Sequence, residues 1–168
     1  MSGIKHFSGF EVVRAAMEVE KNGHRFYSAM AARAADPTLK ELFGWLAQDE
    51  VEHLARLKKL EKSYSDGAFD EHEEDFLPYL ARFSDSEIFP SKERLEEILV
   101  TSTADVQALE LAIEAEEKFA EYFRQASMIA QNPDGRDAFT WLAGEGEPHA
   151  LVLGEGREQL CGGCGGCG

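Results

Sequence analysis

Residues 42–53 read LFGWLAQDEVEH, and the landmarks of this stretch return 96 residues later in the same order. Trp45 and Trp141 stand at equivalent places, and so do His53 and His149. The same offset pairs Glu20 with Glu116, Phe43 with Phe139, Leu46-Ala47 with Leu142-Ala143, and Asp36-Pro37 with Asn132-Pro133. The chain therefore contains a duplicated unit, and acids and histidines stand among its repeated positions.

The first half of each unit has the spacing of an amphipathic helix. An apolar stripe with alternating intervals of three and four residues predicts a helix over 9–35, and the repeat predicts its equivalent over 103–130. Ser8 begins a capping-box signature at the start of the first of these helices. A residue that favours the N-cap followed by a proline, Asp36-Pro37 in the first copy, then opens a second helix in each unit.

Four such helices predict an all-α fold, a four-helix bundle built from two antiparallel hairpins. The hairpins span 9–62 and 103–160, and 168 residues are enough for one domain with a sizeable core, over 1–160. The last eight residues, 161–168, contain only glycine and cysteine, so we expect a flexible tail.

The connection between the hairpins, over 63–102, is too long for an ordinary loop. We expect it to be partly helical, with 73–83 and 91–100 as the candidate helices. We also expect it to return the chain to the end of the bundle where the first helix begins. A connection of this length permits exchange of a hairpin with a second subunit, and we predict a homodimer or a higher homo-oligomer.

The composition limits the class of partner. A formal net charge of -15 argues against binding to nucleic acid, which requires clustered Lys and Arg. Residues 1–10 lack the basic and apolar regions of a signal peptide, and no apolar run approaches the ~20 residues of a membrane span. These features predict a soluble, cytoplasmic protein without a membrane partner.

Five titratable residues stand at stripe positions where leucine or isoleucine would be typical: Glu20, Glu50, His53, Glu116 and His149. Burying an unpaired carboxylate costs several kcal/mol even after relaxation. Protonation, an Arg or Lys partner, or a metal ion can compensate, and the stripes carry no Arg or Lys at this level. Glu50 and His53 share one helical face, where they can bind the same ion or adjacent ions. Mixed imidazole and carboxylate ligands suit iron or manganese.

Three stretches resemble the rubrerythrin branch of the ferritin-like superfamily: AMEVEKNGHRFY over 16–27, LFGWLAQDEVEH over 42–53 and AIEAEEKFAEYF over 112–123. The resemblance covers 9–62 and 103–155. It implies a ferritin-like four-helix bundle that holds a carboxylate-bridged centre of two iron ions. Family members with this centre react with hydrogen peroxide or dioxygen, or oxidise and store iron.

The resemblance also implies a role for each of the five stripe residues. Glu20 and Glu116 would be terminal ligands, and Glu50 would bridge the two ions. His53 and His149 would bind one iron each. Zinc or manganese could replace iron in such a ligand set.

The chain departs from the family pattern at Gly146, where a second bridging glutamate is expected. Four carboxylates neutralise two ferrous ions, whereas three leave a formal charge of +1 around two ions or -1 around a single ion. The site must therefore recruit another anion, rearrange, or bind one ion instead of two.

Glu147 is the candidate replacement ligand. In an unbroken helix it points about 100° away from the seam. Pro148 removes an amide and clashes with the carbonyl four residues earlier, and Gly144 and Gly146 lie beside it. We therefore expect the last helix to be bulged or broken here, which would allow Glu147 to turn towards the metal. Alternatively, Glu145 and Glu147 are both solvated.

Two further stripe residues are expected near the acids. His24 lies one turn from Glu20, and we expect an interior histidine that is hydrogen-bonded to a carboxylate or to the backbone. Tyr27 is expected as a packed aromatic, at a level where its hydroxyl could also donate to a ligand.

All the cysteines of the chain lie in the tail: Cys161, Cys164 and Cys167. No disulfide can therefore crosslink the bundle, which suits a reducing compartment. Three thiolates are short of the four of a tetrahedral iron or zinc site, and the two separated Cys-x-x-Cys pairs of a rubredoxin module are not present. The alternatives to an inert tail are capture of a soft metal and pairing with a partner's tail.

Three functions remain open from the sequence. The first is a rubrerythrin-like peroxidase or ferroxidase that receives electrons from an external donor. The second is an iron-binding protein for storage or trafficking, whose acidic surface attracts Fe(II). The third is a degenerate bundle that binds one ion or none and acts through protein partners.

Overall fold

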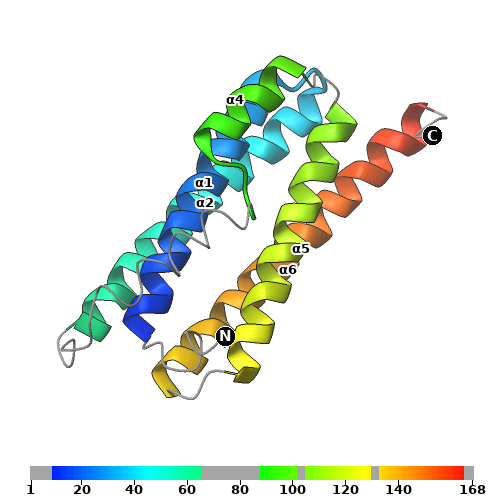
Figure 1. The fold of residues 1–168 in the computed structure, drawn as a ribbon. Helices are drawn as coiled ribbons and strands as arrows, with labels where there is room; N and C mark the ends of the chain where they lie inside the picture. The colour runs from blue at the N-terminus through cyan, green and yellow to red at the C-terminus, as the bar shows by residue number, and fades with distance from the viewer. Residues whose placement is uncertain (1–8, 66–87, 102–104, 130–132, 165–168) are drawn as a thin grey trace.

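The computed structural model describes residues 9–65, 88–101, 105–129 and 133–164. Within these ranges the regular elements are helices: α1 (Gly9–Arg33), α2 (Pro37–Ser65), α4 (Lys92–Thr101), α5 (Asp105–Ile129) and α6 (Pro133–Cys164). Figure 1 shows α1 beside α2 and α5 beside α6. The expected all-α bundle of two hairpins is confirmed. The caps expected at Ser8 and Asn132 and the helix expected over 73–83 lie outside the described residues.

Asp36 caps α2, as its place before Pro37 predicts. Its Oδ1 accepts a hydrogen bond of 3.0 Å from the amide of Leu39, one of the amides that a helix start leaves unpaired. The carboxylate of Asp105, at the start of α5, accepts bonds from the amides of Ala35 (3.2 Å) and Asp36 (2.9 Å). The second hairpin therefore begins against the turn of the first.

This contact corrects the expected course of the crossover. Asp105 places the start of α5 at the α1–α2 turn, which is the end of the bundle opposite to the start of α1. Because α2 runs antiparallel to α1, the chain is already back at the starting end when α2 ends. The connection then leads to the far end, and α5 runs antiparallel to α1 (Figure 1).

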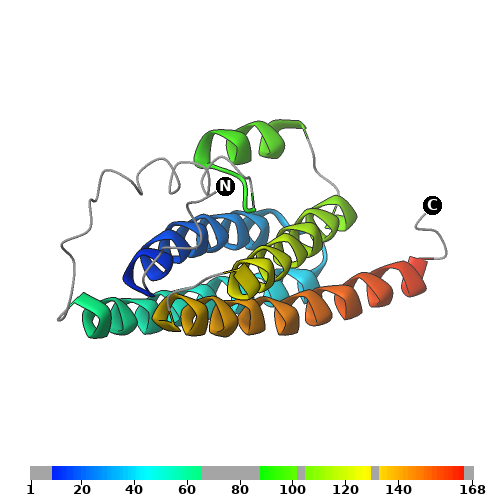
Figure 2. The same cartoon turned by 60° about the horizontal axis from the view of Figure 1, so that its bottom comes forward.

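The helix expected over 91–100 is present as α4. Ser91 caps it, since its Oγ accepts a bond of 3.2 Å from the amide of Arg94. Figure 2 shows α4 lying outside the bundle, on the side of α1 and α5. Phe89, just before α4, is buried, and its ring centroid is 5.6 Å from that of Tyr27. The crossover thus contributes a buried phenyl ring to the core.

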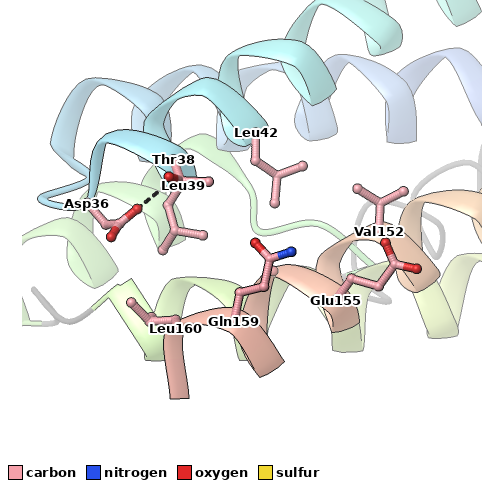
Figure 3. Close-up of a pocket in the computed structure, with 9 residues that line it drawn as sticks. Asp36, Thr38, Leu39, Leu42, Val152, Glu155, Gln159 and Leu160 are labelled. Atoms are coloured by element: carbon pink, nitrogen blue, oxygen red, sulfur yellow. Dashed lines mark hydrogen bonds between the residues drawn. The ribbon is translucent and has the colours of Figure 1, made fainter. Parts of the chain in front are cut away.

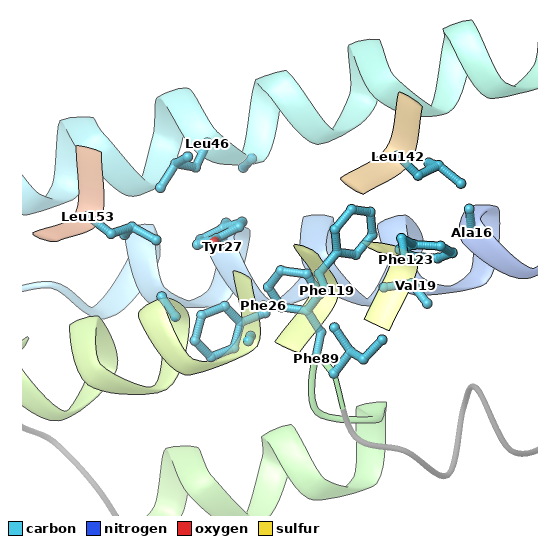
Figure 4. Close-up of a cluster of buried hydrophobic side chains, with 14 of the residues drawn as sticks. Ala16, Val19, Phe26, Tyr27, Leu46, Phe89, Phe119, Phe123, Leu142 and Leu153 are labelled. Carbon is cyan, nitrogen blue, oxygen red and sulfur yellow. The ribbon is translucent and has the colours of Figure 1, made fainter. Parts of the chain in front are cut away.

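Aromatic side chains fill the interior between the hairpins (Figure 4). The fully buried ones are Phe26, Tyr27, Phe43, Phe123 and Phe139. Neighbouring rings meet at short range, for example Phe119 and Phe123 with centroids 4.7 Å apart. Burial of one side chain of this size stabilises the fold by about 1.5–3 kcal/mol. These rings hold the four long helices at a fixed separation, which in turn positions the acids between them.

Helix α6 differs from expectation at two places. It remains helical through Gly144, Gly146 and Pro148, so the expected break is wrong. Packing of α6 along α5 compensates for the ~3 kcal/mol that an internal proline costs. The helix also continues to Cys164, into the segment expected to be a flexible tail, because extending an existing helix adds hydrogen bonds without a new nucleation step. Cys161 is disulfide-bonded.

Candidate metal centre

Five titratable side chains from four helices meet in the interior: Glu20 of α1, Glu50 and His53 of α2, Glu116 of α5 and His149 of α6. Each is exposed by 5% or less. Their oxygen and nitrogen atoms form two groups, each within 4.8 Å, one of Glu20, Glu50 and His53 and the other of Glu50, Glu116 and His149. The two histidines form a further group of this kind with Asp49. The structure thus brings together the five residues that the stripes singled out, and Glu50 belongs to both groups.

The Nδ1 atoms of both histidines face the buried carboxylates. Nδ1 of His53 lies 3.4 Å from Glu50 Oε2 and 3.7 Å from Glu20 Oε1. Nδ1 of His149 lies 3.2 Å from Glu116 Oε1 and 3.5 Å from Glu50 Oε1. The two imidazole rings are stacked, with centroids 5.2 Å apart and planes inclined by 16°. Glu50 therefore directs one oxygen to each histidine, as a bridging carboxylate would.

The outer Nε2 atoms of the same rings meet a second pair of acids. Asp49 Oδ2 lies 2.5 Å from Nε2 of His149, and Glu145 Oε2 lies 2.9 Å from Nε2 of His53. Each acid therefore reaches the histidine of the other hairpin. Sequence reasoning missed both residues, although Asp49 and Glu145 are equivalent in the 96-residue repeat. A carboxylate on the outer nitrogen fixes the tautomer and orientation of an imidazole and raises its basicity as a ligand.

Tyr27 and His24 make the kinds of contact that their places in the stripe predict. The hydroxyl of Tyr27, fully buried, donates a bond of 2.6 Å to Glu116 Oε1. Burial, the charge of Glu116 and this bond together raise the pKa of Tyr27 well above its usual value, so the hydroxyl keeps its proton. Nδ1 of His24 pairs with the carbonyl oxygen of Ala47 at 2.9 Å. His24 is thus bonded to the backbone and is not part of the cluster.

Burial and close charges act in opposite directions on the cluster. Burial lowers the pKa of an imidazole, but contacts with Glu116 and Glu50 outweigh it and raise the pKa of His149 to about 11. For His53 burial is likewise outweighed by the contact with Glu50, and its pKa is raised. Burial raises the pKa of Glu50, but its contacts with both imidazoles lower it overall. Without metal, the histidines therefore hold protons that a cation would displace.

The residues present fit a metal ion. Oε2 of Glu50 is buried and forms no hydrogen bond within the described part of the chain. An unsatisfied carboxylate oxygen in the interior is costly, and a cation between the carboxylates and Nδ1 atoms would satisfy it. Three carboxylates and two imidazoles form a donor set that suits iron or manganese. With Asp49 and Glu145 included, five carboxylates face two divalent ions, which leaves a formal charge of -1 (4 - 5) rather than +1.

The part of the sequence that contains the centre is similar to known proteins. The sequence profile of the rubrerythrin family matches residues 11–155, a range that contains both groups. The chain belongs to the rubrerythrin family. Among solved structures, a hypothetical protein from Pyrococcus furiosus is similar, with a TM-score of 0.57 and 22% identity over 93% of this chain and 92% of that chain. This likeness shows a shared fold. A comparison with curated proteins gives no match.

The rubrerythrin-family bundle is ferritin-like and all-α. Across the described ranges, none of its helices combines the length and the apolar character that crossing a membrane requires.

Glu147 does not take the role expected for it. Its side chain is 62% exposed, and its Oε1 lies 2.5 Å from Nη2 of Arg124 on α5. Because α6 stays helical through Pro148, residue 147 remains about 100° from the seam. Glu145, on the other side of Gly146, is the acid that faces the centre in this rubrerythrin-family chain, so the expectation that it is simply solvated is wrong.

Two variants on α6 distinguish these acids. We expect Glu145→Gln to weaken metal binding about 10–100-fold, because it removes the carboxylate behind His53. Glu147→Gln makes the same chemical change two residues away, and we expect it to leave affinity unchanged. Titration of the metal-free protein with Mn(II) measures both. Equal affinities of the two variants would contradict the role of Glu145.

A second pocket, of about 260 Å³, lies between the start of α2 and the C-terminal half of α6 (Figure 3). It is lined by Asp36, Thr38, Leu39, Leu42, Val152, Glu155, Gly156, Gln159 and Leu160. These residues do not include a member of either metal-ligand group. The pocket is therefore separate from the candidate centre of the rubrerythrin-family bundle.

Proposed function

We propose that this chain is a di-iron oxidoreductase that reduces hydrogen peroxide or dioxygen. The placement of Glu50 carries the proposal. Its Oε1 lies 3.5 Å from Nδ1 of His149, and its Oε2 lies 3.4 Å from Nδ1 of His53. A carboxylate shared in this way could hold two ions, and two ferrous ions could each supply one electron to a two-electron reduction. Membership of the rubrerythrin family supports iron as the metal.

Each residue of the cluster has a defined part in this proposal. Glu20 and Glu116 would hold one ion each, Glu50 would be shared between the two ions, and the two histidines would bind through Nδ1. Two ferrous ions held here would supply the two electrons that convert peroxide to water. Asp49 and Glu145 hold the Nε2 protons of the imidazoles, which leaves both Nδ1 atoms free to bind.

Tyr27, Phe89 and Phe119 control the surroundings of the centre. The Tyr27 hydroxyl donates a hydrogen bond of 2.6 Å to Glu116 Oε1, so that this carboxylate retains a donor when the charge of the centre changes. Phe89 and Phe119 line the site and exclude water from it. We further propose that a separate electron carrier restores the reduced state, and that the chain forms a homodimer or a higher homo-oligomer.

Peroxide titration of the anaerobic protein loaded with Fe(II) tests the function. We expect consumption of one peroxide per two ferrous ions, with two protons taken up and two waters formed, and renewed consumption after dithionite is added. Glu147→Gln should behave as the wild type, since this acid lies outside the cluster. Uptake of iron well beyond two ions per chain would favour storage instead. Absence of both activities would contradict the proposal.

A further inference from the structure

Gly146 lies where α6 approaches α5 most closely at the level of the centre. A Cβ at this position would be 3.0 Å from Cδ1 of Phe119 and 3.2 Å from the carbonyl oxygen of Glu116. It would also lie 3.5 Å from Cβ of Ala120. Gly144, two residues earlier on the same helix, has open space instead, with nothing within 4 Å. A side chain at 146 therefore requires Phe119 and the α5 backbone to give way by a few tenths of an ångström, whereas one at 144 meets no neighbour.

Two pairs of equivalent positions in the repeat carry side chains of very different size. Glu50 is equivalent to Gly146, and Gly23 is equivalent to Phe119, each 96 residues apart. The first hairpin thus combines a large acid with a glycine, and the second combines a glycine with a phenyl ring. Phe119 is 2% exposed and lines the same site as the acids. In the second hairpin these two positions are in contact, because a Cβ at 146 would lie 3.0 Å from Cδ1 of Phe119.

We propose that Phe119 determines the ligand set of the centre: its ring occupies the space that an acid at position 146 would need, so that one side of the centre is bounded by a phenyl ring and is completed by a small exogenous ligand. This inference rests on the proposed metal centre. Each group offers three protein ligands, which leaves coordination positions open. The open positions suit a small anion of the size of hydroxide or azide, because the surrounding wall is closely packed.

A double-mutant cycle on the metal-free protein tests the steric part. Gly146→Glu should lower the melting temperature in the wild-type background, because the new side chain meets Phe119 and the backbone of α5. In a Phe119→Ala background the same substitution should lower it much less, since the two sites are in contact. Gly146→Ala, alone and with Phe119→Ala, provides the same comparison if the larger acid prevents folding. Gly144→Glu, which adds the same charge in open space, should not lower the melting temperature, because it also removes the conformational cost of a glycine inside a helix.

Cobalt binding tests the ligand set. We expect the Phe119→Ala/Gly146→Glu protein to bind Co(II) at least tenfold more tightly than the wild type, and its visible spectrum to respond less to azide. The inference is overturned if Gly146→Glu alone is fully stable and gains affinity, or if the cycle shows no coupling. It is equally overturned if azide perturbs wild type and double variant alike. Failure of the wild type to bind any metal would instead contradict the proposed function, while the melting temperatures would still report on Phe119.

Discussion

Replacement of Glu50 by alanine is expected to remove both metal ions from the centre. Glu50 is common to the two ligand groups, so its loss leaves each group with one carboxylate and one histidine. Metal content should fall from two ions per chain to nearly none after gel filtration. Loss of the buried partner of both imidazoles should also destabilise the metal-free protein by roughly 3–5 kcal/mol. Metal analysis and urea denaturation measure the two effects.

Two other acids serve as controls for Glu50→Ala. Glu20 belongs to one group only, and Glu20→Ala should therefore leave the ion held by Glu116 and His149 in place. Glu52 is exposed on the same helix as Glu50, and Glu52→Ala should retain both ions. If Glu50→Ala keeps two ions while Glu20→Ala loses one, then Glu50 is not a bridge and the proposed centre is wrong.

The metal-free protein is expected to lose stability as the pH rises from 6.5 towards 11. The pKa of His149 is about 11 in the folded chain, compared with an ordinary value of 6.5. A group with a raised pKa stabilises the folded state fully below its unfolded pKa, and this contribution disappears as pH rises to the folded pKa. Since one pKa unit corresponds to about 1.36 kcal/mol, the total effect is on the order of several kcal/mol.

The metal-loaded protein should not show this decline, because its Nδ1 atoms hold an ion in place of a proton. Melting temperatures of both forms between pH 6 and pH 10 make the comparison. Calorimetry in buffers of different ionisation enthalpy should detect proton release when metal binds. His149→Asn should flatten the profile of the metal-free protein. A melting temperature that rises with pH in the metal-free wild type would disprove this account of the cluster.

The sequence predicts the centre well because helical periodicity and duplication constrain the same residues. An acid in an apolar stripe must point inward if the helix exists, and the repeat places Glu20 and Glu116 at matching depths. The cap at Asp36 follows from local chemistry alone. These features depend on one helix at a time, which is why they can be read without knowing how the hairpins pack. That the five residues bind metal stays a prediction.

The contacts of the residues that flank the stripe depend on how the helices pack against each other, and the sequence does not specify that packing. Glu145 and Glu147 lie on either side of position 146, each about 100° from it. Periodicity treats them alike, and only the placement of the neighbouring helices separates them. Glu145 meets His53 of α2, whereas Glu147 meets Arg124 of α5. The unbroken course of α6 through Pro148 is likewise set by packing against α5 rather than by local propensity.

Asp49 and Glu145 each contact the histidine of the other hairpin, and this arrangement bears on the origin of the chain. Each hairpin presents an acid to the imidazole of its neighbour, although Asp49 also lies 3.5 Å from Nε2 of His53 in its own hairpin. Two identical copies of residues 9–62 would supply four glutamates and two histidines by symmetry alone. A single-hairpin ancestor could therefore have assembled a complete centre as a dimer. With both copies in one chain, the two halves can differ, as they do at Glu50 and Gly146, whereas two identical hairpins cannot.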